Sequence, residues 1–100
     1  MEPLSSKQKK YLKSQANSLK PLVQIGKGGV NQQSIQSIDV ALGQHELIKV
    51  KFIAFKTEKE QFLDSIIEGA NAQFVSLIGH VLTLYREHEE QEKRNYKLPE

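Results

Sequence analysis

Cysteine is absent from this sequence of 100 residues. A chain without thiols forms no disulfide and offers no thiolate ligand to zinc, so disulfide-stapled secreted domains and zinc fingers are both excluded. No apolar run approaches the roughly 18 residues of a membrane-spanning helix, and the start MEPLSSKQKK lacks the apolar segment of a secretory signal. We therefore expect a cytoplasmic protein without a membrane partner.

Acidic residues are missing from positions 3 to 38, where lysines are frequent. Residues 1–56 hold nine lysines and three acids, a net charge of +6, whereas residues 57–100 hold five basic and nine acidic residues, a net charge of −4. Such asymmetry favours attraction of a polyanion to the basic half. On charge alone, an ordinary solvated surface is the simpler interpretation.

The spacing of apolar residues predicts seven elements in the order α-β-α-β-α-β-β. A first helix starts after a serine cap at position 5 or 6 and ends before Pro21, and a strand follows at residues 22–25. A second helix runs from an Asn31 cap to Gly43, and the alternation in HELIKVKF indicates the second strand. A capping box at residues 57–60 opens the third helix, and QFVSLIGHVLTLYR forms a hairpin that turns at Gly79 and His80.

This order predicts one small α/β domain, with helices packed on a mixed four-stranded sheet. Strands joined by a helix pair in parallel, whereas the last two strands form an antiparallel hairpin. With 38% hydrophobic residues, the chain is suited to a single core, which we assign to residues 1–86. Residues 87–100 lose apolar periodicity apart from Tyr96 and Leu98 and are expected to form a charged, mobile or loosely docked tail.

The most informative motif, QIGKGGVNQQS at residues 24–34, places Gly26, Lys27, Gly28 and Gly29 between a strand and a helix. A P-loop is excluded because Lys27 is followed by glycine, and a dinucleotide-binding pattern fails at Asn31. The motif does satisfy G-x-x-G, with which KH-type domains clamp the backbone of single-stranded RNA. Backbone N–H groups at a helix start suit phosphate, and Lys27 adds positive charge.

Lysines beyond the loop extend the predicted RNA-binding surface. The first helix has no acid beside its lysines, and the alternation in the second strand predicts one buried face and one wet, basic face. The candidate phosphate contacts outside the loop are Lys7, Lys9, Lys10, Lys13, Lys49 and Lys51.

LSSKQKKYLKSQANSLKPLVQIGKGGV, HELIKVKF and IGHVLTLYR, in this order and at these spacings, closely resemble a known family. It is the bacterial stand-alone form of the chloroplast RNA splicing and ribosome maturation (CRM) domain, the YhbY-like proteins. The resemblance covers residues 4–86 and extends to KLP at residues 97–99. It implies an RNA-binding α/β fold related to the C-terminal domain of a bacterial translation initiation factor. It also implies association with precursors of the large ribosomal subunit.

By this resemblance, residues 26–29 match the RNA-contacting loop of the family, and the predicted lysines fall in its basic surface regions. Arg86 matches the arginine of the family's LYR ending, where it either contacts phosphate or caps the sheet edge with charge. The sequence departs from the family pattern at Gly28, where relatives often have asparagine, and at Asn31, where threonine is frequent.

Catalysis and metal binding have no support in the sequence. The histidines at positions 45, 80 and 88 lack the spacing of a helical metal pair, and no Ser-His-Asp order with a nucleophile elbow is present. We predict a protein that is not an enzyme, without metal, cofactor or small-molecule substrate, whose aromatic residues lie mainly in the core. Two alternatives remain: a protein-protein adaptor that uses charged helical faces, and a protein that binds a small phosphate ligand.

Overall fold

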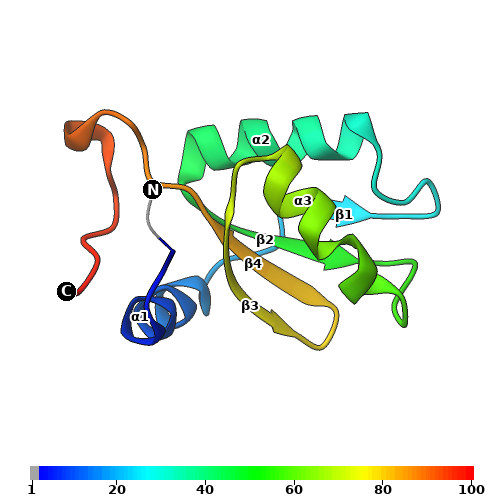
Figure 1. The fold of residues 1–100 in the computed structure, drawn as a ribbon, viewed down its shortest axis with the longest axis horizontal. Coiled ribbons are helices and arrows are strands. Elements are labelled where there is room, and N and C mark those ends of the chain that lie inside the picture. The colour runs from blue at the N-terminus through cyan, green and yellow to red at the C-terminus, as the bar shows by residue number, and fades with distance from the viewer. Residues whose placement is uncertain (1–2) are drawn as a thin grey trace.

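The computed structural model describes residues 3–100, and its elements follow the predicted order (Figure 1). The helices are α1 (Ser6–Ala16), α2 (Gln32–His45) and α3 (Leu63–Gly69), and the strands are β1 (Val23–Ile25), β2 (Leu47–Phe52), β3 (Gln73–Ile78) and β4 (Val81–Tyr85). The sheet has the order β1-β2-β4-β3, with β1 parallel to β2 and the other pairs antiparallel. The predicted mixed four-stranded α/β fold is therefore confirmed.

The sheet separates two hydrophobic clusters. Helices α2 and α3 lie on one face, over the main core that contains Ile48, Val50 and Phe52 of β2, and α1 lies on the other face (Figure 1). The second, smaller cluster comprises Leu4, Leu12, Ala16, Leu47, Val75 and Tyr85. No helix within residues 3–100 is both long and apolar enough to span a bilayer.

The wet, basic face predicted for the second strand is only partly present. Leu47 is fully buried and Lys49 is half-buried, while Lys51 is exposed. The cause is tertiary: α1 packs across this face of the sheet, and its Leu12 and Ala16 cover the first half of β2.

Local signals placed two helix starts correctly. The Ser5 hydroxyl accepts the N–H of Gln8 at 3.1 Å, and the Asn31 side chain accepts the N–H of Ser34 at 2.9 Å, so both predicted caps are confirmed. The hairpin turn is also confirmed, with Gly79 at φ 58°.

Three predicted boundaries are wrong. Helix α2 continues past Gly43 to His45, and Glu46 takes the left-handed position (φ 64°) because its buried side chain is held by distant backbone. The capping box at residues 57–60 does not form, since the Thr57 hydroxyl donates to the Glu58 carboxylate instead. A 3₁₀ turn, η1 (Lys59–Phe62), therefore precedes α3. The first strand begins at Val23, one residue later than predicted, although the exposed Leu22 still donates its N–H to the Lys49 carbonyl at 3.1 Å.

Figure 1 shows the segment 87–100 beyond one end of the sheet, at the left, and its last residues reach the side of the sheet that α1 covers. Tyr96 and Leu98 pack on the smaller cluster, and the Gln8 side chain donates to the Pro99 carbonyl at 3.1 Å.

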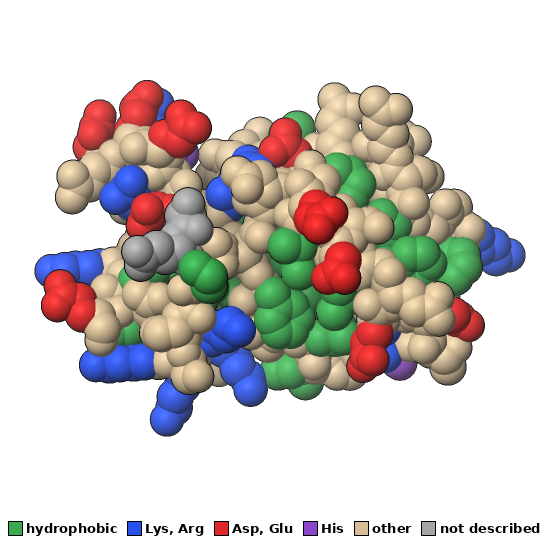
Figure 2. Space-filling model, viewed as in Figure 1, with side chains coloured by type: hydrophobic (Ala, Val, Ile, Leu, Met, Phe, Trp, Pro, Cys, Tyr) green, Lys and Arg blue, Asp and Glu red, His purple; other side chains and the backbone are tan. Residues whose placement is uncertain are grey.

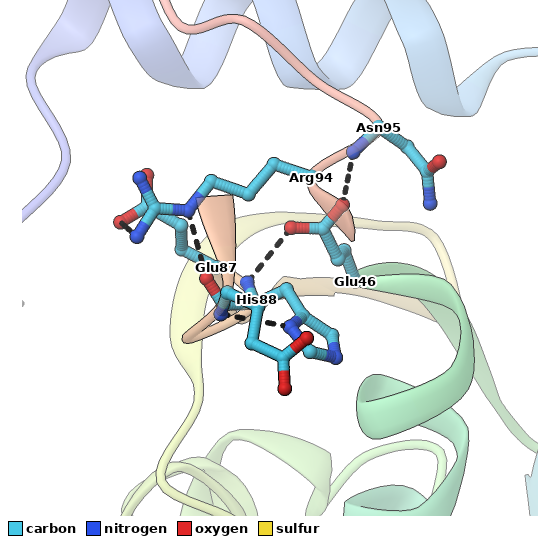
Figure 3. A network of polar contacts seen from close by, with 6 residues as sticks. Glu46, Glu87, His88, Arg94 and Asn95 are labelled. Carbon is cyan, nitrogen blue, oxygen red and sulfur yellow. Dashed lines mark hydrogen bonds and ion pairs between the residues drawn. The ribbon is translucent and has the colours of Figure 1, made fainter. Parts of the chain in front are cut away.

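Figure 3 shows the buried Glu46 carboxylate between the backbone N–H groups of His88 and Asn95, both of which donate to it. Arg94 fixes the turn between them by donating to the His88 carbonyl at 2.7 Å and pairing with Glu87 at 3.3 Å. One short turn, η2 (Gln91–Lys93), lies within this segment.

Candidate nucleic-acid interface

The glycine-rich loop connects β1 to α2 at one end of the sheet (Figure 1). The Gly29 N–H donates to the Gly26 carbonyl at 2.9 Å and closes a tight turn, and Gly29 has φ 69°, which a side chain would strain. Gly26 differs, since its φ is ordinary and a Cβ built there would meet no atom within 4 Å. The fold thus requires glycine at Gly29 but not at Gly26, where the bare backbone leaves room for another molecule.

The loop also presents positive charge to solvent. Within residues 3–100, the N–H groups of Lys27 and Gly28 donate to no acceptor, and the Lys27 side chain is exposed. Asn31 and Ser34 cap α2 reciprocally, which places the helix start and its partial positive charge directly behind the loop. Open amides, a helix N-terminus and an ammonium group together suit a phosphate.

The four predicted lysines of α1 form a separate basic region. Lys7, Lys10 and Lys13 are exposed, whereas the Lys9 ammonium lies 5.6 Å from the centroid of the Phe74 ring. Figure 2 shows blue side chains gathered at the lower left, where Figure 1 draws α1. A further one projects at the far right, where Figure 1 draws the loop. On this face, basic side chains thus lie near α1 and near the loop, at opposite ends of the molecule.

The two predicted lysines of β2 differ in their surroundings. The Lys49 ammonium donates to the Leu19 carbonyl at 3.1 Å and so stabilises the end of the segment that follows α1. Lys51 is exposed and pairs in register with Val81, next to the hairpin turn. Lys51 is therefore the β2 lysine that is open to a ligand.

Arg86 is bound within the protein. Its guanidinium donates to the Asp39 carboxylate at 2.6 Å, to the Asp39 carbonyl at 2.9 Å and to the Ala70 carbonyl at 2.6 Å. These contacts join β4 to the last turns of α2 and to the end of α3. Since the loop precedes the first turn of α2, the structure does not bring Arg86 together with the loop.

A basic group beside the loop was predicted only in part from the sequence. It joins Lys51, which was predicted as a site residue, to Lys56, Lys59 and His80, which were not, and is called here the hairpin-tip cluster. The Phe52 N–H donates to the His80 carbonyl at 2.8 Å, and the Lys59 ammonium donates to the Lys56 carbonyl at 2.7 Å. Desolvation and then the positive charges of Lys59, Lys56 and Lys51, in that order, lower the pKa of His80 below its ordinary value. The cluster carried no sequence signal, because Lys56 and Lys59 alternate with acids and only the pairing of β2 with β4 brings His80 near them.

The segment 53–55 attaches this cluster to the glycine-rich loop. The N–H groups of Ile53 and Ala54 both donate to the Ile25 carbonyl, at 2.9 and 3.1 Å, immediately before the loop begins. A methyl group built on Gly29 would lie 3.4 Å from a carbon of the Phe55 ring. The loop and the hairpin-tip cluster therefore form one end of the molecule.

Metal chemistry has no visible centre in the described part of the chain. Residues 3–100 contain no group of three or more histidine, aspartate or glutamate side chains that could hold an ion. His45 is exposed at the end of α2, and His88 lies in the C-terminal segment, where its ring accepts the N–H of Glu90 at 3.1 Å.

Comparisons with known proteins agree with this geometry. The sequence model of the CRS1 / YhbY (CRM) domain matches residues 4–86. The chain is 38% identical over 97 residues to "Probable RNA-binding protein YqeI" of Bacillus subtilis, covering 96% of this chain and 99% of the relative. It is 42% identical over 91 residues to an "RNA-binding protein" of Haemophilus influenzae, covering 90% and 92%.

A solved structure shares both sequence and fold with this chain. The solution structure of the hypothetical protein SAV1595 from Staphylococcus aureus superposes with a TM-score of 0.80 at 37% identity, covering 96% of this chain and 99% of that one. The domain match and these relatives together settle the family: the chain belongs to the CRS1/YhbY (CRM) domain family.

Proposed function

We propose that this protein binds RNA and assists assembly of the large ribosomal subunit without catalysing a reaction. The observation that carries the proposal is the geometry of the loop. The fold would tolerate a side chain at Gly26, yet glycine leaves the backbone there open to another molecule. Next to it lie the Lys27 side chain and the N–H groups of Lys27 and Gly28, which donate to no acceptor within residues 3–100. Membership in the CRM family and the names of its relatives support RNA as the ligand.

In this proposal, RNA phosphates lie against the loop amides and the Lys27 ammonium, with the first turn of α2 behind them. The four α1 lysines and Lys51 extend the contact surface, whereas Lys49 and Arg86 act mainly within the fold. The longest dimension of the molecule is 37 Å. An RNA that reaches both the loop and α1 must therefore cross much of the protein, as a folded ribosomal RNA segment can.

Sedimentation of cell extract on a sucrose gradient, with and without ribonuclease, tests this function. We expect the protein to move with free large subunits or their precursors and to return to the top after ribonuclease treatment. Lys27→Glu is expected to shift the protein toward the top of the gradient. The matched control is Lys93→Glu, which makes the same change of charge in the C-terminal segment, where Lys93 forms an exposed ion pair with Glu90. It should leave the position in the gradient unchanged.

Two other outcomes would contradict the proposal. Comigration that survives ribonuclease would indicate a protein-protein adaptor. A wild-type protein that stays at the top of every gradient, and that inorganic phosphate or a nucleotide stabilises against heat, would indicate a small phosphate ligand.

A further inference from the structure

Phe55 combines three unusual properties beside the glycine-rich loop. Its backbone is left-handed, with φ 56°, a conformation that is a strained outlier for a bulky residue. The residue is 36% exposed, and it directly follows Ile53 and Ala54, whose N–H groups donate to the Ile25 carbonyl. Strain of this kind persists where the surrounding structure enforces it, and it concentrates at binding sites.

The ring is fixed by neighbours without being buried. It meets Phe62 edge to face, with ring centroids 5.4 Å apart and planes at 78°, and a methyl group built on Gly29 would lie 3.4 Å from one of its carbons. Phe62 packs on the main core, whereas Phe55 does not. Core formation therefore explains Phe62 but leaves the orientation of Phe55 unexplained.

Two lysines lie in the turn that follows this exposed ring, together with Glu58, whose N–H donates to the Phe55 carbonyl at 3.2 Å. Lys56 follows Phe55 directly and is exposed, and Lys59 donates to the Lys56 carbonyl at 2.7 Å, which keeps both lysines in one turn. With Lys51, which pairs in register with Val81, and His80, whose carbonyl accepts the Phe52 N–H at 2.8 Å, they make up the hairpin-tip cluster, next to the loop that contains Lys27. A partly exposed aromatic ring beside ammonium groups is a combination with which proteins bind single-stranded nucleic acid.

We propose that Phe55 stacks on an unpaired base of an RNA strand whose adjacent phosphates contact the glycine-rich loop and the hairpin-tip cluster. The preferred ligand is then single-stranded or looped RNA, because a continuous duplex keeps the faces of its bases inside the stack. This inference rests on the proposed RNA binding and specifies the class of RNA. Stacking on a single ring tolerates any base, so the contact supplies affinity rather than sequence specificity.

A fluorescent variant reports the contact directly. The chain contains no tryptophan, so Phe55→Trp introduces a single indole at this position. We expect oligoadenylate to quench its fluorescence and an abasic oligonucleotide of equal length, which has phosphates but no bases, to leave it unchanged. Val40→Trp, at an exposed position on α2, is the control and is expected to respond to neither. Equal quenching by both oligonucleotides, or none by oligoadenylate, would overturn the stacking contact.

Affinity measurements separate this inference from RNA binding itself. Phe55→Leu removes the aromatic face and is expected to weaken oligoadenylate binding about tenfold while leaving abasic binding unchanged. Lys27→Glu is expected to weaken both. Wild-type affinity in Phe55→Leu would overturn the stacking alone, whereas a wild-type protein that binds neither oligonucleotide at low salt would overturn both proposals. Where Phe55→Leu fails to fold, the fluorescence of Phe55→Trp decides.

Discussion

Replacing Glu46 with glutamine is expected to release residues 87–100 while the sheet stays folded. The Glu46 carboxylate is 1% exposed and accepts the N–H of His88 at 2.8 Å and the N–H of Asn95. Hydrogen bonds to a charged group contribute roughly 1.5–3 kcal/mol each. Glutamine retains one acceptor oxygen but turns an NH₂ group toward the second amide, so one bond is lost and the other becomes neutral.

The free energy that holds the C-terminal segment is therefore expected to fall by at least about 2 kcal/mol. The loss stays local, because the main core between the sheet and α2 and α3 contains no residue of this segment. A decrease of about 2 kcal/mol raises the opening equilibrium, and hence amide exchange, about 30-fold. The free energy of global unfolding, measured from the melting of the whole domain, should change by less than the free energy of this local opening.

Hydrogen exchange at the amides of His88 and Asn95 measures the effect. Glu89→Gln, at an exposed position of the same segment, is the control and should leave both amides protected. Unchanged protection in Glu46→Gln would refute the role of the carboxylate. Rapid exchange in the wild-type protein would refute it as well, and would support the mobile tail predicted from the sequence.

Two further predictions concern stability. Gly29→Ala should lower the free energy of unfolding, measured by chemical denaturation, by about 1–2 kcal/mol, because alanine at φ 69° is strained and its methyl group would meet Phe55. Gly26→Ala should leave the free energy of unfolding unchanged and weaken RNA binding. Equal effects of the two substitutions on stability would contradict the geometry of the loop. Burial and then the charges of Glu46 and Glu87 raise the pKa of Tyr85, so the folded state favours the neutral phenol. The free energy of unfolding that this preference contributes is fully present below about pH 10 and falls as the pH rises above it. The Tyr85 hydroxyl is buried and has no hydrogen-bond partner within residues 3–100, so Tyr85→Phe should be no less stable than the wild-type protein at pH 7. The variant should also lose part of the fall in stability at alkaline pH. A variant less stable at pH 7 would contradict the view that this hydroxyl has no partner.

Local rules accounted for most of the fold. Ser5 and Asn31 carry their capping information within three residues, and the turn at Gly79 lies between two apolar runs, so both kinds of signal can be read along the chain. Gly43 misled the prediction because the end of α2 is set by Glu46, whose conformation depends on a segment more than 40 residues away.

The site was predictable only in part, because contacts between residues that are distant in the sequence cannot be read along the chain. The glycine-rich loop is contiguous in sequence and was found there. The hairpin-tip cluster depends on the pairing of β2 with β4, and Phe55 looked like one more core aromatic until its exposure and positive φ were visible. Lys49 looked exposed because alternation along a strand cannot show that another helix covers that face.

The salt dependence of RNA binding tests the central claim most directly. The logarithm of the affinity of wild-type protein for single-stranded RNA should fall linearly with the logarithm of salt concentration, and Lys27→Ala should reduce the slope by about 0.7, the release expected for one phosphate contact on a single strand. Lys93→Ala, in the C-terminal segment, should leave the slope unchanged. An unchanged slope and affinity in a folded Lys27→Ala variant would contradict the assignment of the glycine-rich loop as the RNA-binding site.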